Sequence, residues 1–550
     1  MQQWWKEGVI YQIYPRSFQD SNGDGIGDIP GIISRLGEIS ALGIKAIWLS
    51  PVYKSPQIDN GYDISDYLSI DPVFGTMADM ERLLAEAKKI DIGIIMDLVI
   101  NHTSDEHEWF QKSRKREEPY TDYYIWRKAP NNWTSFFMED TWVYDEIRGE
   151  YYLHLFHKKQ PDLNYRNPLV VEEAKKILQF WLEKGVAGFR CDVINVLWKS
   201  SLEDGKKSIM LTGLEHYKCR EGNHEILRQL RRDVLDKYGA FTVGEAVMVN
   251  LEDVKLLSDE NRRELDMAFY FDHLEVDRRV ARFIPKKFRA KELLKRLAKW
   301  QEGLEWNALY LENHDQNRIV SHYGDHREAG EKDSPWERSA KLMATLLFTL
   351  RGTPFIFQGQ EIGMTNFDFS SLEEVKDIET HNLDRLMKKL FIPRRLRWKW
   401  LRISSRDNSR TPYQWNGESG AGFSTGKPWL GINSNHKKIN YKNQQDDPDS
   451  VLSYYKKMIK LRASSETLKY GDFIPLLAAN SLLMFSRESA NGEAFVAAFN
   501  FSPKRITISE EVRIFLQGKI AASNYNRTTW DSSNKTLESW EALILEKIRR

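Results

Sequence analysis

The chain has 550 residues, more than an ordinary single domain, so we expect two or three domains and a large buried core. Lys and Arg total 80 and Asp and Glu total 79, and this balance argues against nucleic acid or a membrane surface as a partner. The only cysteines are Cys191 and Cys219, so a disulfide framework is not expected. The sequence contains neither a signal-peptide pattern nor an apolar run of membrane length, which predicts a soluble cytoplasmic protein.

Short runs rich in Ile, Val, Tyr and Phe alternate with helix-like segments along the first 360 residues. These runs cover residues 9–15, 44–51, 93–102, 188–194, 240–245, 266–271, 307–315 and 354–359. Eight alternations of strand and helix predict an α/β protein with a (β/α)8 TIM barrel. The alternative, an open doubly wound sheet, would need a Gly-rich phosphate-binding turn after the first strand. The loop at that place is acidic, which is the wrong charge for a phosphate.

Two segments interrupt the alternation. Residues 103–170 are polar and aromatic and too long for a connection, so they predict a small inserted domain between barrel parts 1–102 and 171–470. A second, loop-rich excursion covers about residues 365–447. From residue 471 to 550, short alternating strands predict a C-terminal antiparallel β-sandwich domain.

Polar side chains gather at the ends of the predicted strands, where the active site of such a barrel lies. They are Asp97, Asn101, His102, Arg190, Asp192, Glu245, His314 and Asp315. Buried ion pairs also occur for purely structural reasons, but those would not need to share one end of the barrel. The shared position therefore favours an active site.

Three of these carboxyl groups suit the cleavage of a glycosidic bond, which needs one acid and one carboxylate. Asp192 follows Arg190 by two residues on one strand, so the guanidinium should lower its pKa and keep it anionic. Glu245 ends an apolar strand, where desolvation should raise its pKa toward roughly 6–7 and make it the acid. A separation of about 5–5.5 Å between the two would indicate retention of configuration. Asp315 can bind and orient sugar hydroxyls.

The loop at residues 20–28 is rich in oxygen ligands. Its candidate cation ligands are the side chains of Asp20, Asn22, Asp24 and Asp28 and the carbonyl of Ile26. The twelfth position of this loop, counted from Asp20, is Gly31, where an EF-hand has Glu, so the loop is no EF-hand. The spacing of its oxygen ligands still suits Ca²⁺. The same residue types also favour a flexible acidic turn, and the residues alone leave both interpretations open.

Several segments resemble the signature segments of the α-amylase family. They cover residues 9–15, 97–102, 160–164, 188–192, 244–245 and 312–315. The segment Gln160-Pro161-Asp162-Leu163-Asn164 is similar to that of the oligo-1,6-glucosidase and dextran glucosidase branch. The similarity covers nearly the whole chain.

The resemblance implies a retaining mechanism with Asp192 as nucleophile, Glu245 as acid/base and Asp315 as stabiliser of the transition state. It also implies a first glucose subsite formed by His102, Arg190, His314 and, stacking beneath the sugar, Tyr62. The pair matching Asp59 and Arg410 would close the pocket at the non-reducing end, so that single glucose units are removed. The loop at 20–28 matches the calcium site of the branch, which favours structural Ca²⁺ there, and no organic cofactor is expected.

Within this branch, enzymes that cleave α-1,6 linkages have Val at the position after the nucleophile, whereas those that cleave α-1,4 linkages have Ala or Thr. Val193 therefore indicates α-1,6 specificity. Residues 245–248 depart from the branch pattern, which leaves the second subsite open. Residues 316–320 do not match the Arg-rich loop of sucrose isomerases, so isomerisation is not expected.

The leading hypothesis is therefore an exo-acting retaining α-glucosidase that cleaves α-1,6 bonds in isomaltose and short isomalto-oligosaccharides. We expect a monomer whose partner is this small substrate, with no nucleic acid and no membrane. Alternatives are an α-glucosidase acting on α-1,4 bonds or sucrose, and a trehalose-6-phosphate hydrolase that uses the basic run at 394–399. A non-catalytic amylase-like binding subunit is a hypothesis of another class, but such subunits lack the three carboxylates and carry a membrane helix.

Overall fold

A computed structural model describes residues 3–208, 210–278, 285–531 and 533–547. Its centre is a parallel sheet of eight strands in the order β11-β10-β9-β5-β2-β1-β13-β12. The strands are β1 (Ile10–Ile13), β2 (Ala46–Leu49), β5 (Gly93–Leu98), β9 (Gly188–Cys191), β10 (Phe241–Glu245), β11 (Met267–Phe269), β12 (Ala308–Leu309) and β13 (Thr353–Phe357). Each lies within or overlaps a predicted strand, which confirms the α/β class and the barrel.

Side chains close the barrel where the two edge strands β11 and β12 meet. The Tyr270 hydroxyl donates to Asn307 Oδ1 at 3.0 Å, and the Tyr310 hydroxyl donates to the Tyr270 carbonyl at 2.9 Å. The residues just outside the two short strands therefore supply the hydrogen bonds that a longer ladder would make.

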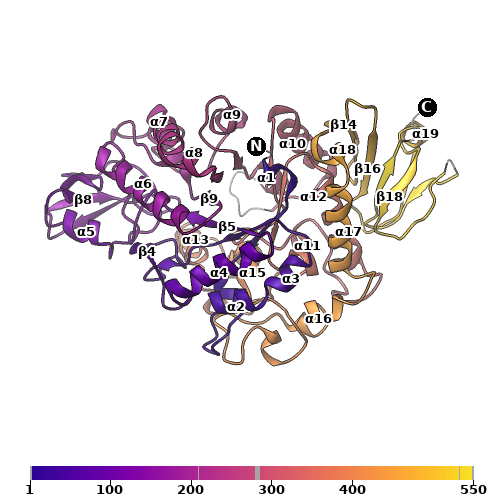
Figure 1. Ribbon diagram of the computed structural model, residues 1–550, viewed down its shortest axis with the longest axis horizontal. Coiled ribbons are helices and arrows are strands. Elements are labelled where there is room, and N and C mark those ends of the chain that lie inside the picture. The colour runs from indigo at the N-terminus through magenta and orange to yellow at the C-terminus, as the bar shows by residue number, and fades with distance from the viewer. Residues whose placement is uncertain (1–2, 209, 279–284, 532, 548–550) are drawn as a thin grey trace.

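Helices cover the outside of the barrel, which is why its strands are apolar on both faces. In α4 (Met77–Lys89), Met80, Leu83 and Ala87 face the core at helical spacing, and Thr76 caps the helix. The other covering helices are α2 (Ile29–Ser34), α3 (Leu36–Ser40), α6 (Pro168–Glu183), α7 (Glu221–Leu230), α9 (Leu251–Ser258), α10 (Ala290–Gly303), α12 (Pro335–Thr349) and α17 (Val451–Ala463). In Figure 1 they surround the central strands.

The segment between β5 and α6 forms a separate three-stranded antiparallel sheet, at the left of Figure 1. Its strands are β6 (Trp126–Arg127), β7 (Trp142–Asp145) and β8 (Glu150–Leu153). Trp133 and Trp142 of this unit share an apolar cluster with Val193 and Val196, which follow β9. The inserted unit therefore packs against the loop that carries the predicted nucleophile.

The sequence did not predict the small hairpin of β3 (Tyr53–Lys54) and β4 (Asp66–Ile70) after β2. Its connecting loop carries Asp59 and Tyr62. The excursion after β13 was expected to be loop-rich, but it contains two helices of 12 and 11 residues, α13 (Ile378–Lys389) and α14 (Arg394–Ser404). The short helices α15 (Asp407–Arg410) and α16 (Tyr441–Gln444) follow.

The C-terminal part forms a five-stranded antiparallel sheet, at the right of Figure 1. In the order β14-β15-β16-β20-β18, its strands are β14 (Asp472–Ala478), β15 (Leu482–Glu488), β16 (Ala494–Asn500), β20 (Ala542–Glu546) and β18 (Lys519–Ser523). A two-stranded sheet of β17 (Ile506–Thr507) and β19 (Thr536–Leu537) accompanies it. Within the described ranges, no helix is both long and apolar enough to cross a membrane.

Candidate active site

The buried guanidinium of Arg190 contacts three carboxylates. Its Nη1 lies 2.7 Å from Asp97 Oδ1 and 2.7 Å from Asp192 Oδ1, and its Nη2 lies 2.8 Å from Glu245 Oε2. These residues come from the ends of the neighbouring strands β5, β9 and β10. The two carboxyl groups predicted for catalysis therefore lie against one cation.

The predicted fall in the pKa of Asp192 was wrong. Burial raises this pKa to about 7, Arg190 offsets only part of the rise, and Asp97 adds to it. The physical reason is that the single charge of Arg190 is shared among three carboxylates, so Asp192 receives only part of its stabilisation. The sequence showed Arg190 and Asp192 as a pair and gave no sign of the other two partners.

The pKa of Glu245 rises as the sequence predicted. Burial raises it to about 7, with Arg190 opposing the shift and Asp192 and Asp315 adding to it. The backbone N–H of Val193 donates to Glu245 Oε2 at 3.3 Å, which helps to fix the carboxyl group. A carboxyl group with this pKa can hold a proton near neutral pH and release it to a substrate.

Asp315 is held as an anion by three cationic or donor groups. Arg410 Nη2 lies 2.6 Å and Arg406 Nη1 3.3 Å from Asp315 Oδ1, and His314 Nε2 lies 3.1 Å from Oδ2. Burial raises the pKa of Asp315, but His314, Arg406 and Arg410 outweigh burial and hold the pKa well below its usual range. Asp315 is therefore charged at neutral pH, whereas the pKa values of Asp192 and Glu245 lie near 7.

Tyr62 and His314 form a flat aromatic wall beside these groups. Their rings are nearly parallel, at 6° and 5.4 Å between centroids, and the Tyr62 hydroxyl lies 2.7 Å from His314 Nε2. Gln12 Nε2 lies 2.8 Å from His314 Nδ1, so Nδ1 accepts and Nε2 carries the proton. The Tyr62 hydroxyl also donates to Asp97 Oδ2 at 3.1 Å.

Gln160 links two of the other predicted site residues. Its Nε2 donates to Asp59 Oδ2 at 3.2 Å and lies 3.3 Å from His102 Nε2. Gln160 Nε2 also donates to the Tyr62 carbonyl at 3.1 Å, so the amide joins its own segment to His102 and to the loop that carries Asp59 and Tyr62. The sequence had indicated Gln160 only as part of a family motif.

In the structure Asp59 pairs with Arg406, which the sequence analysis did not single out, and the closing of the pocket by Asp59 and Arg410 stays a prediction. Arg406 Nη2 lies 3.5 Å from Asp59 Oδ1 and 2.7 Å from Asp377 Oδ1, so Arg406 connects Asp59, Asp377 and Asp315. Arg410 instead lies on Asp315. Both arginines belong to one short segment, and only their position in space shows which one reaches Asp59.

Val193 has a left-handed backbone, with φ 36° and ψ 40°. This conformation is strained for a β-branched residue. It ends strand β9 at Cys191, earlier than predicted, and turns the Val193 N–H toward Glu245. The residue that indicates linkage specificity therefore also contacts the predicted acid through its backbone.

A buried lysine that the sequence did not single out supports the His102 side of the site. Lys199 Nζ lies 2.6 Å from Asp162 Oδ1 and donates to Asn101 Oδ1 at 3.0 Å. Asn101 Nδ2 in turn lies 3.2 Å from His102 Nδ1. No spacing rule marks Lys199, because lysines are normally exposed and only the fold reveals its burial.

A family model described as the catalytic domain of alpha-amylase matches residues 12–471. The chain belongs to the α-amylase family. It is a glycoside hydrolase with a TIM barrel, and the predicted family is confirmed.

Two relatives and one solved structure agree with this assignment to the α-amylase family. The oligo-1,6-glucosidase of Parageobacillus thermoglucosidasius is 46% identical, over 99% of each chain. The oligo-1,6-glucosidase of Halalkalibacterium halodurans is also 46% identical, over 91% of this chain and 90% of its own. The crystal structure of Bacillus licheniformis trehalose-6-phosphate hydrolase is 40% identical, with a TM-score of 0.91 over 99% of each chain.

The loop at 20–28 is held by its own hydrogen bonds. Asp20 Oδ1 accepts from the backbone of Asn22 at 2.9 Å and of Gly23 at 2.8 Å, and Asp28 caps α2 through Gly31. In the described part of the chain, no three His, Cys, Asp or Glu side chains form a group that could hold a metal ion. The oxygen ligands are of the type that Ca²⁺ prefers, but the calcium site stays a prediction.

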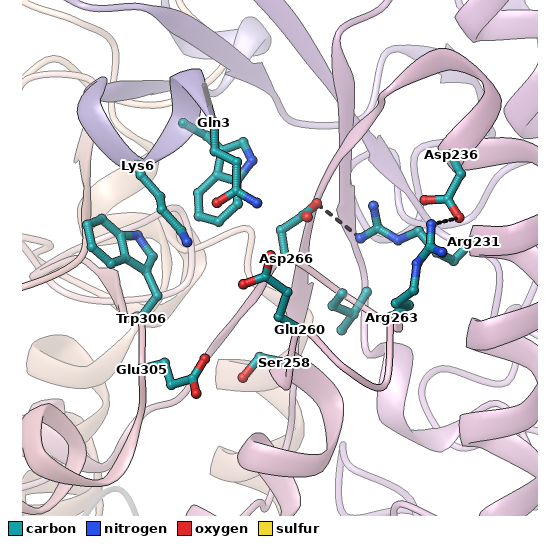
Figure 2. A pocket seen from close by; sticks show the side chains of 12 residues that line it. Gln3, Lys6, Arg231, Asp236, Ser258, Glu260, Arg263, Asp266, Glu305 and Trp306 are labelled. Atoms are coloured by element: carbon teal, nitrogen blue, oxygen red, sulfur yellow. Dashed lines mark hydrogen bonds and ion pairs between the residues drawn. The ribbon is translucent and has the colours of Figure 1, made fainter. Parts of the chain in front are cut away.

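A polar cleft lies at the other end of the barrel (Figure 2). It is lined by segments that precede β1, β11 and β12, so it lies at the amino ends of the strands. Figure 2 shows Arg231 paired with Asp266 and Arg263 paired with Asp236, at 3.0 and 2.6 Å. In this barrel fold, chemistry belongs to the opposite end, where Arg190 and its carboxylates lie.

Proposed function

We propose that this glycoside hydrolase is an exo-acting, retaining α-glucosidase that cleaves α-1,6 bonds at the non-reducing end of isomaltose and short isomalto-oligosaccharides. The observation that carries the proposal is the arrangement of Asp192 and Glu245 on one guanidinium with Asp315 nearby as an anion. The names of the two relatives described above, both oligo-1,6-glucosidases, support the linkage.

In the first step, the Asp192 carboxylate attacks the anomeric carbon of the terminal glucose and the bond to the leaving oxygen breaks. Glu245 gives its proton to that oxygen, and a covalent glucosyl ester on Asp192 results. Positive charge develops on the sugar ring in the transition state. Asp315, which Arg406 and Arg410 keep ionised, is suited to stabilise that charge.

In the second step, Glu245 acts as a base and takes a proton from a water molecule. The water oxygen attacks the anomeric carbon and the ester bond to Asp192 breaks, which releases glucose with its original configuration. Arg190 contacts both carboxyl groups, so it can compensate for the negative charge whichever of the two carries it.

The contacts around Asp59 support an action at chain ends. Asp59 is bound by Arg406 from the excursion after β13 and by Gln160 from the inserted unit. Tyr62 and His314 form the wall beside them. A pocket closed by side chains from three segments would accept a terminal glucose and exclude an internal one.

The deciding experiment measures glucose release by the purified protein from isomaltose, maltose, sucrose and trehalose 6-phosphate at neutral pH. Preference for isomaltose supports the proposal. Preference for trehalose 6-phosphate would contradict it and favour the activity of the structurally similar hydrolase. Release from none of the four would revive a non-catalytic role.

A further inference from the structure

Helices α13 and α14 form a hairpin that projects from the excursion after β13. Leu383, Met387 and Leu401 pack between the two helices. At its base the hairpin is attached to the inserted unit, where Asn382 Nδ2 donates to the Phe137 carbonyl at 3.4 Å. The remainder of the hairpin, residues 388–399, is called the hairpin tip below.

Apolar side chains are exposed at the hairpin tip. Phe391 is 93% exposed and Leu390 63%, and Leu396 beside them is 38% exposed. Phe391 also has a left-handed backbone, with φ 57°, at the position after the helix end. Ile392 N–H donates to the Met387 carbonyl and Phe391 N–H to the Lys388 carbonyl, which is a helix ending that normally has Gly at this position. A large apolar residue therefore occupies a strained and fully exposed position.

Five exposed cations flank these apolar residues in the sequence: Lys388, Lys389, Arg394, Arg395 and Lys399. Among the described residues, the hairpin arginines that form ion pairs are Arg385, Arg397 and Arg402, and none of these five cations forms one. Arg394 and Arg395 lie in the first turn of α14, where the helix dipole disfavours positive charge. The whole chain has a net charge of only +1, so the hairpin tip is a local concentration of positive charge.

We propose that the hairpin tip binds the surface of an anionic lipid bilayer. Exposed Phe and Leu side chains ringed by Lys and Arg are the pattern of a segment that inserts its apolar side chains among lipids and pairs its cations with their headgroups. Phe391 is 93% exposed, so a protein partner would need a preformed hollow for its ring, whereas a bilayer deforms around it. This binding is peripheral and independent of the proposed activity, and its test also tests the expectation that no membrane surface is a partner.

The test is co-sedimentation of the full-length protein with vesicles of phosphatidylglycerol and phosphatidylcholine, compared with phosphatidylcholine alone. Binding is expected to the anionic vesicles, to weaken as salt is added, and to be absent for the neutral vesicles. Phe391→Gly removes the apolar anchor and suits the left-handed backbone, so this variant should fold and bind about tenfold more weakly.

The double variant Arg394→Glu with Arg395→Glu should also fold, because it favours the dipole of α14, and should lose binding by about tenfold or more. Lys206→Glu with Lys207→Glu, in an exposed loop, is the matched control and should bind like the parent. No sedimentation with anionic vesicles at low salt, or equal binding by all variants, would overturn the proposal. A parent dimer in light scattering that Phe391→Gly converts to a monomer would also overturn it, because a second copy would then cover the tip.

Discussion

Glu245 and Asp192 have similar pKa values but different predicted roles, and the leaving group can separate them. Glu245→Gln should lose about a hundredfold or more in kcat/KM on isomaltose, because its leaving oxygen needs a proton. An activated aryl glucoside needs none for bond cleavage, so there the loss should be much smaller. Asp192→Asn should abolish activity on both isomaltose and the aryl glucoside. Initial rates of the three proteins check this, and equal losses for Glu245→Gln on both substrates would argue against Glu245 as the acid.

The two raised pKa values predict a narrow pH profile. Catalysis needs Asp192 without its proton and Glu245 with its proton. Activity should therefore fall below about 7 as Asp192 is protonated and above about 7 as Glu245 ionises. The measurement is kcat/KM on isomaltose from about pH 4.5 to 9, a range that extends to both sides of the two pKa values.

Glu245→Gln on the aryl glucoside is the control for this profile. With Glu245 removed, the alkaline decline should disappear while the acidic decline, which belongs to Asp192, remains. Activity that does not change between about pH 5 and 8 would show that the pKa values of Asp192 and Glu245 lie outside this interval.

At the scale of single elements, Arg406 joins the start of α13 to the site. Asp377 caps α13 and binds Arg406 at 2.7 Å, and Arg406 continues to Asp59 and Asp315. Arg406→Met should leave these carboxylates and that of Glu379 without their shared cation, so kcat/KM on isomaltose should fall by about a hundredfold or more.

Arg402→Met is the matched control for Arg406→Met, because Arg402 pairs with the exposed Asp368 away from these groups. It should keep nearly the full activity. Equal activity of the Arg406 variant and the parent would show that Asp59 and Asp315 do not depend on this arginine.

The loop before α2 makes a separate prediction about calcium. We propose that its oxygen atoms bind Ca²⁺, with Asp20, Asn22, Asp24, Asp28 and the Ile26 carbonyl as ligands. Removal of calcium with a chelator should then lower the Tm by several degrees, and added Ca²⁺ should restore it. The Asp24 side chain accepts a hydrogen bond from the nearby Ile26 N–H. The variant Asp24→Ala should have a Tm that no longer responds to the chelator. A parent Tm that does not respond would contradict the site.

The elements also show how far the sequence could predict this molecule. The eight barrel strands are buried on both faces, so each is an apolar run that the sequence displays. The hairpin of β3 and β4 was missed because β3 has two residues and no repeating pattern. The contact of Arg406 with Asp59 was missed because Arg406 and Arg410 lie only four residues apart. Which of the two arginines reaches Asp59 depends on how the chain folds, and the sequence does not show it.

At the scale of the whole molecule, the buried Arg487 connects the C-terminal sheet to the barrel, and the buried Arg462 binds the same end of α12. Arg487 in β15 donates to the Thr349 carbonyl at the end of α12 at 2.7 Å and to the Leu468 carbonyl at 2.8 Å. Arg462 in α17 donates to the Phe348 and Leu350 carbonyls at 3.0 and 2.8 Å. Backbone carbonyls at a helix end have a partial negative charge, so they can stabilise a buried guanidinium that has no carboxylate partner.

Arg487→Met should therefore destabilise the junction without changing the chemistry. It removes the arginine donor from the buried Thr349 and Gly471 carbonyls, each at a cost of about 1–3 kcal/mol, so the Tm should fall by several degrees. The kcat on isomaltose, measured well below the Tm of the variant, should match that of the parent, because the substitution changes none of the residues that contact Arg190. Arg505→Met, which removes an exposed pair with Glu538, should change the Tm by little. If both variants melted like the parent, the C-terminal sheet would be held by its apolar contacts with the barrel, and the buried arginines would add little to the joint stability of the two units.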